Sequence, residues 1–104
     1  MKSPTHRVID KTLDLPDGEK IVLYDMAFAP KSVPLEEFNG NVYRLSKTGD
    51  FLWQISAPPG QGPKKSFTDI FFDESGKLKT FRFDCVVYEI DIQTGNAKAV
   101  DYWK

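Results

Sequence analysis

The sequence predicts an all-β domain of eight strands, arranged as two sequential four-stranded antiparallel meanders. Three observations predict it: apolar residues alternate with polar ones over short runs, glycine-bearing turns separate these runs, and the second half repeats the order of the first. The chain has 104 residues, so we expect one domain spanning 1–104. Its hydrophobic content of 40%, with eight Phe, four Tyr and two Trp, can supply a core. We expect the two meanders to pack as a sandwich or a roll.

The first half contains four strand signals and three turn signals. The second strand signal is strongly apolar and β-branched, and the fourth places Phe51, Trp53 and Ile55 on one face by alternation. The turn sequence Pro16-Asp17-Gly18 separates the first two strands. The expected strands are Arg7–Leu15, Lys20–Phe28, Asn41–Ser46 and Phe51–Ser56.

The second half follows the same plan, with Phe81 and Phe83 expected on one face of its second strand. Tyr43 and Tyr88 lie 45 positions apart in similar strings, which indicates an internal repeat of 7–56 and 67–103. The Pro- and Gly-rich stretch 57–66 is expected to link the halves. The expected strands are Phe67–Asp73, Leu78–Asp84, Val86–Ile92 and Ala97–Trp103.

The halves differ between their second and third strands. The second half needs only Asp84-Cys85 there, whereas the first half inserts residues 29–40, with two prolines and an Asn-Gly pair. We expect a loop with one helical turn over 35–38 and almost no other helix. A long insertion in a tight meander is where a partner site is expected.

The strings NVYRLSKTGDFLWQI and VVYEIDIQTGNAKAV resemble the inner hairpins of quinoprotein-like β-propeller blades. The chain also resembles small stand-alone bacterial proteins of uncharacterised function, through a pattern that begins at Asn41 and closes with Thr94-Gly95. The resemblance implies blade-like repeats and, by fold-level analogy, a toxin-neutralising (immunity-type) role. It does not imply a quinone cofactor, because two blades cannot close the ring that such a site needs.

Composition argues against several functional classes. The formal net charge is −1, without the basic surplus of a nucleic-acid binder. The sequence shows neither a signal peptide nor a membrane span, so we expect a cytoplasmic protein. His6 and Cys85 lack neighbouring partners in sequence, so we expect no catalytic residue, no cofactor and no metal. Whether the chain is an enzyme stays open, with a non-catalytic role favoured.

The leading hypothesis is a non-catalytic protein-binding module, with the immunity-type protein as its specific form. The candidate partner surface is Leu35, Glu36, Glu37, Phe38, Glu89, Asp91, Tyr102 and Trp103. These residues lie in the insertion, on a strand face that carries two carboxylates, and at an aromatic end of the chain.

Two alternatives remain open. One is a homo-oligomeric structural domain, for example a homodimer whose incomplete blades pair across a twofold axis. The other is a small-ligand binder or enzyme with a site between the two sheets, where Arg44, Asp69 or Arg82 would converge on an apolar cleft lined by Trp53. A cross-strand pair between Asp69 and Arg82 is also expected if their strands are neighbours.

Overall fold

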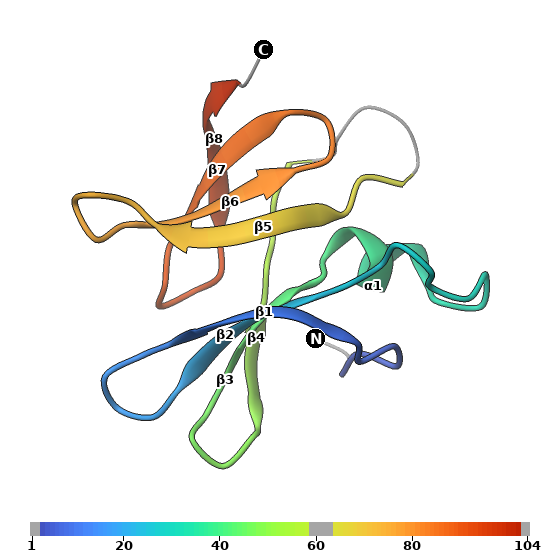
Figure 1. Cartoon of the computed structure of the whole chain (residues 1–104), viewed down its shortest axis with the longest axis horizontal. Helices are drawn as coiled ribbons and strands as arrows, with labels where there is room; N and C mark the ends of the chain where they lie inside the picture. Colours follow the sequence, from blue (N-terminus) through green and yellow to red (C-terminus); the bar gives the residue numbers. More distant parts are fainter. Residues whose placement is uncertain (1–2, 59–63, 103–104) are drawn as a thin grey trace.

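The computed structural model describes residues 3–58 and 64–102, and within them it confirms the predicted fold class. The first sheet has the order β1-β2-β3-β4 and the second the order β5-β6-β7-β8, all antiparallel (Figure 1). One short helix, α1, forms where the helical turn was expected. The elements are β1 Ile9–Asp14, β2 Lys20–Tyr24, α1 Leu35–Asn39, β3 Val42–Leu45, β4 Phe51–Gln54, β5 Phe67–Phe72, β6 Leu78–Arg82, β7 Val86–Ile90 and β8 Ala97–Tyr102.

The two sheets share one hydrophobic core, to which both contribute one face. Apolar area removed from water at this interface stabilises the fold by about 25 cal/mol per Å². The buried members are Ile21, Leu23, Val42, Trp53 and Ile55 from the first half, and Phe67, Ile70, Leu78, Val86, Tyr88 and Ile90 from the second. The middle of the expected linker, 59–63, lies outside the described residues.

Matched positions of the two sheets face opposite ways relative to this core. Tyr43 lies on the outer face of the first sheet, whereas Tyr88 belongs to the shared core. Their diagonal neighbours on the adjacent strands follow the same rule: Tyr24 packs on Tyr43 outside, and Arg82 lies on the Tyr88 ring inside. The sheets therefore stack front to back, as repeat-like blades do, and not as a mirror-related sandwich. The boundaries of the repeat stay a prediction.

Corresponding irregularities support this relation. An extra residue bulges each sheet's first strand, at Asp10 in β1 and Thr68 in β5. An offset of 58 residues separates them, and the same offset separates the turn glycines Gly18 and Gly76, which both have positive φ. Each fourth strand is bulged as well. A β-bulge bends its strand and increases the local twist.

The bulge in β4 overturns one expectation. Phe51 was expected on the same face as Trp53 and Ile55. Leu52 is the unpaired residue between the pairs Arg44–Trp53 and Leu45–Phe51, so alternation breaks there. Phe51 consequently packs on the outer face against the Tyr43 ring, at 5.4 Å between centroids.

A second expectation fails in β6. Phe83 was expected beside Phe81 on a strand reaching Asp84, but β6 ends at Arg82. The chain turns through Phe83, Asp84 and Cys85, and Cys85 has a positive φ of 68°. Phe83 is therefore turned out of the sheet and is 66% exposed.

The side chain of Asn41 joins the sheets. Its amide nitrogen donates to the carbonyls of Tyr24 (2.7 Å) and Phe67 (2.9 Å), and its oxygen accepts the Phe67 N–H at 2.9 Å. Asn41 is fully buried. A side-chain amide has the donor and acceptor of a peptide group. The Asn41 side chain therefore makes, between β2 and β5, the hydrogen bonds that a backbone peptide group of a strand would make.

The β7–β8 turn contacts the first sheet so closely that Gly95 has no space for a side chain. Its φ is +81°, and an added Cβ would lie 2.7 Å from the Trp53 ring. Gly76 has nearly the same φ, +80°, with nothing within 4 Å of an added Cβ. Gly76→Ala should cost only the left-handed backbone penalty, about 1–2 kcal/mol. Gly95→Ala should cost about 1–3 kcal/mol more through overpacking. Urea denaturation of both variants measures the difference, and equal losses would contradict the contact.

Candidate functional site

The inserted segment, residues 29–40, covers the outer face of the first sheet. There it helps to build a second hydrophobic cluster, separate from the core between the sheets. The buried members are Val22, Tyr24, Met26 and Tyr43, with Ala29, Val33, Phe38, Leu45 and Phe51 packed around them. The insertion predicted as a partner site therefore has a structural side as well as an exposed side.

A buried carboxylate fixes the segment to the N-terminal residues. Glu37 in α1 is 6% exposed, and it accepts the Thr5 hydroxyl at 2.9 Å and the His6 N–H at 2.8 Å. Burial by itself would raise the pKa of Glu37, but hydrogen bonds from the His6 backbone, then from Thr5, hold that pKa below its ordinary value. The carboxylate is thus held in its charged form as part of the fold.

On one side of α1 lies an apolar cleft between the two sheets, of about 390 Å³, which we call the inter-sheet cleft. Phe38 of α1 and the exposed Phe83 form part of its wall, and the Lys64 ammonium lies 5.2 Å from the centre of the Phe38 ring. Its lining residues are Asp10, Asp25, Met26, Ala27, Phe38, Lys64, Ser66, Phe67, Thr68 and Phe83.

On the other side of α1 lies a more polar cleft of about 300 Å³, which we call the Tyr43 cleft. Tyr43 is 1% exposed, and its hydroxyl has no hydrogen-bond partner in the described part of the chain. Burial, followed by the negative charge of Glu37 and then by Tyr24 and Glu36, raises the pKa of Tyr43 well above its ordinary value, while Arg7 lowers it. The lining residues are Ser3, Thr5, Pro34, Glu36, Glu37, Tyr43 and Gln54.

The predicted residues of the insertion take different positions. Leu35 is 49% exposed and Glu36 is also exposed, so both remain accessible to a partner. Glu37 and Phe38 face the protein, one in the carboxylate anchor and the other in the outer cluster.

The other predicted residues lie elsewhere. Glu89 and Asp91 share a shallow hollow of about 330 Å³ beside the β7–β8 turn, where Lys77 lies 3.8 Å from Glu89 and Asp91 accepts the Gln93 N–H at 2.9 Å. Tyr102 is exposed at the end of β8, and Trp103 lies outside the described residues. Figure 1 places α1, the β7–β8 turn and the end of β8 at three separate places, so the candidates form no single surface.

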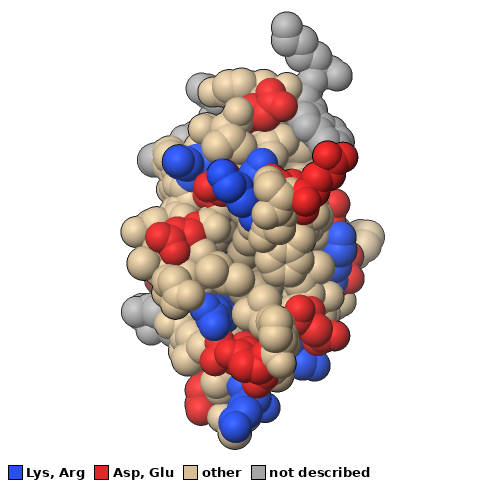
Figure 2. Space-filling view, turned by 90° about the vertical axis from the view of Figure 1, so that its left-hand side faces the viewer, with Lys and Arg blue, Asp and Glu red and all other residues tan. Residues whose placement is uncertain are grey.

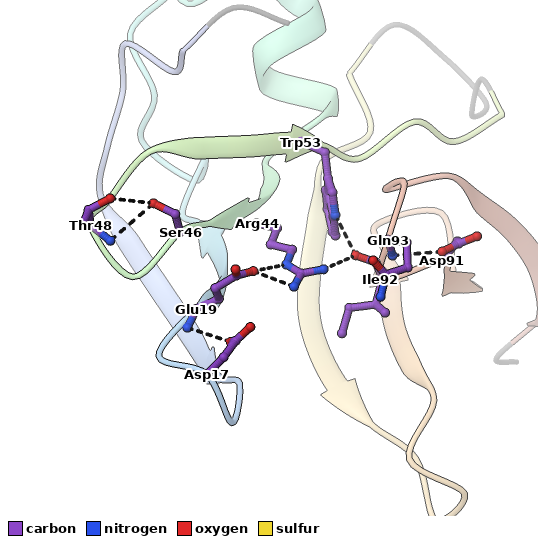
Figure 3. Close-up of polar contacts among 9 residues, drawn as sticks. All are labelled: Asp17, Glu19, Arg44, Ser46, Thr48, Trp53, Asp91, Ile92 and Gln93. Carbon is purple, nitrogen blue, oxygen red and sulfur yellow. Dashed lines mark hydrogen bonds and ion pairs between the residues drawn. The ribbon is translucent and has the colours of Figure 1, made fainter.

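The structure brings Trp53 and Arg44 together, as the ligand-binding alternative required. Both donate to the carbonyl of Ile92, each at 2.8 Å, and Glu19 pairs with Arg44 at 2.5 Å (Figure 3). Every partner here belongs to the protein itself. The arrangement therefore connects the first sheet to the β7–β8 turn.

The expected pair between Asp69 and Arg82 is not formed. The bulge at Thr68 sets Arg82 opposite Phe67, and Arg82 pairs with Asp84 at 3.1 Å instead. Asp69 reaches across to Lys11 of β1, at 2.9 Å. The charged groups expected to converge on a ligand are thus held in separate structural pairs.

Charge and metal-ligating groups are dispersed. On the face that carries the β1–β2 and β5–β6 turns, acidic and basic side chains alternate without a patch of one sign (Figure 2). Among residues 3–58 and 64–102, no group of three or more His, Cys, Asp or Glu side chains is placed to hold a metal ion. Within the same residues, no helix has the length and apolar character to cross a bilayer.

Sequence reasoning placed Glu36, Glu37 and Phe38 in the candidate surface but missed the other residues that line the two clefts. Met26 and Phe83 were expected as strand residues, and no role was expected for Ser3 and Thr5. The usable signal for Phe83 was its place directly before the expected connection Asp84-Cys85. Nothing local marks Tyr43, because its unpartnered hydroxyl depends on neighbours from three distant segments.

The comparisons with known proteins assign a family. Residues 9–102 match the model of a domain of unknown function, DUF7957, so the chain belongs to that family. No curated protein and no solved structure matches the chain.

Glu37→Gln tests the carboxylate anchor. Because the pKa of Glu37 is lower folded than unfolded, its stabilisation is complete above the ordinary value of 4.5 and is lost as the pH falls through the folded value. We expect the variant to lose about 1–2 kcal/mol at pH 7 and to approach the wild type in acid. Glu36→Gln, at the exposed neighbouring position, should change stability by less than about 0.5 kcal/mol. Denaturation across pH measures both, and a pH-independent loss would contradict the anchor.

Tyr43→Phe tests the unpartnered hydroxyl. The ring contacts with Tyr24 and Phe51 are retained, and a buried polar group without a partner is removed. The free energy of unfolding should stay level or rise by up to about 1 kcal/mol. A loss above about 1 kcal/mol in thermal or urea unfolding would mean that the hydroxyl is bonded within the fold.

Proposed function

We propose that this protein is a non-catalytic protein-binding module whose partner binds at the exposed side of the inserted segment and at the adjoining inter-sheet cleft. The observation that carries the proposal is a group of large apolar side chains that the fold leaves in water. Phe28 is 94% exposed just before the insertion, and Phe83 is 66% exposed on the cleft wall. Exposed aromatics beside an apolar cleft are typical of binding anchors.

The chemistry of the cleft indicates what the partner presents. Its interior is apolar, through Met26 and Phe67 together with the aromatic wall. Asp10 and Asp25 also line it. Two ammonium groups balance them: Lys64 lies on the Phe38 ring, and Lys65 lies 5.6 Å from the centre of the Phe83 ring. A partner with an apolar anchor flanked by charges of both signs is complementary to this lining.

The specific form of this proposal is a toxin-neutralising role. The partner is then a toxic protein encoded beside this chain, which the module binds and blocks. The support is a small fold with a cleft at its one long insertion, in which the charged residues weighed for a ligand site, Arg44, Asp69 and Arg82, are held in structural pairs.

The partner test uses a matched pair of apolar-to-polar variants. Phe83→Ser removes an anchor on the cleft, and Val100→Ser removes an apolar side chain on exposed β8. A protein bound by the wild type in the native host's lysate should bind at least about tenfold more weakly to Phe83→Ser and equally to Val100→Ser, as hot-spot losses of about 1.4 kcal/mol or more imply. A partner lost only with Val100→Ser would place the binding surface elsewhere.

A second candidate is a homodimer formed through β8. All residues of this edge strand except Ala97 are exposed, including Val100 and Tyr102. An exposed apolar edge can pair with a second copy. Sedimentation at increasing concentration decides: a dimer that Val100→Ser dissociates supports this candidate, and a monomer throughout removes it.

A further inference from the structure

The Tyr43 cleft contains a polar group without a hydrogen-bond partner among the described residues, the hydroxyl of Tyr43. The Tyr43 hydroxyl is buried, and no described residue bonds to it. Most buried polar groups in native proteins are hydrogen-bonded, so an exception calls for a specific explanation. A ligand group that enters the cleft provides one.

The hydrogen-bonding groups around Tyr43 leave acceptors and few donors. Gln54 uses its Nε2 amide group on the carbonyls of Glu36 and Gly40, at 3.1 and 3.0 Å. The Thr5 hydroxyl donates to Glu37. The exposed carboxylate of Glu36 and the oxygen of Tyr43 therefore remain to accept hydrogen bonds.

The local charge is also negative. Glu36 and Glu37 both line the cleft, and Arg7 is the one basic residue among the described groups whose charge lowers the pKa of Tyr43. Arg7 is already engaged, because its Nε donates to the Pro4 carbonyl at 2.8 Å and its guanidinium lies 5.1 Å from the centre of the Phe51 ring. Two carboxylates thus face one cation.

We propose that the Tyr43 cleft binds a guanidinium group, which donates to the Tyr43 oxygen and to the Glu36 carboxylate. A guanidinium presents five N–H donors in one plane, so it reaches two acceptors at once, whereas an ammonium is a point charge. This inference is independent of the proposed protein-binding function, because that function uses the inter-sheet cleft and the guanidinium would bind in the Tyr43 cleft on the other side of α1.

Butylguanidinium is the probe, and its neutral counterpart butylurea is the control ligand. Backbone amide shifts are followed by NMR during titration of the wild-type protein at low salt. Butylguanidinium should shift the amides of residues 35–37, Tyr43 and Gln54 in a saturable way, and butylurea should not. Equal responses to both ligands, or shifts confined to other regions, would overturn the proposal.

Variants then assign the contacts. Tyr43→Phe and Glu36→Gln should each weaken butylguanidinium binding by at least about tenfold, the loss expected for one hydrogen bond to a charged group. Glu74→Gln removes an exposed carboxylate from the β5–β6 turn and should leave affinity unchanged. Undiminished binding by a folded Tyr43→Phe protein would exclude the site. Glu37 is unsuitable for this test, because it anchors the segment.

The guanidinium can come from a small molecule or from an arginine side chain of a protein. A blocked Gly-Arg-Gly peptide, compared with its citrulline counterpart, separates these sources. Tighter binding of the arginine peptide than of butylguanidinium assigns the group to a protein segment. Binding of butylguanidinium with exclusion of the peptide assigns it to a small molecule.

Discussion

The buried side chain of Asn41 is the contact on which the rest of the structure depends. Its three hydrogen bonds join the end of β2 to the start of β5, and so one sheet to the other. Because Asn41 follows the inserted segment directly, the same contact fixes where that segment ends. Losing the amide would leave buried backbone groups of Tyr24 and Phe67 without partners, which costs more than the bonds contribute.

Front-to-back stacking of the two sheets gives the inserted segment a structural role. Two stacked sheets leave one face of each uncovered, as in the terminal units of repeat proteins. The first sheet covers its face with the inserted segment, held by Glu37. The outer face of the second sheet instead carries charged side chains, among them Lys79 and Glu89. The matched positions of the first sheet, Ile21 and Arg44, lie on its inner face. The inner side of the insertion thus completes the fold, and its outer side stays exposed between the two clefts.

The sequence predicted the features that depend on local pattern. Alternation and glycine turns were enough for the eight strands and their two sheets, and the inserted segment was enough for the helical turn of α1. The bulge at Leu52 was not predicted, because Phe-Leu-Trp alternates as a regular strand does, and only the pairing with β3 shows the extra residue. The partners of Glu37 and Asn41 are 17 to 32 positions away, and no local pattern specifies such contacts. Sequence reasoning therefore predicted the exposed residues of the inserted segment, Leu35 and Glu36. It did not predict the unpartnered hydroxyl of Tyr43.

Hydrogen exchange of the backbone amides in Asn41→Leu tests the central claim, that one buried amide couples the two sheets. Leucine has a similar volume and no hydrogen-bonding group. Asn96→Leu makes the same change at an exposed position, in the β-bridge to Ser56, whose hydrogen bonds involve only backbone groups. The account predicts that amides of β2, β3, β5 and β6 lose protection together in Asn41→Leu, by about 3 kcal/mol or more, while Asn96→Leu resembles the wild type. Wild-type protection in β5 and β6 of Asn41→Leu, with loss confined to β2 and β3, would contradict it.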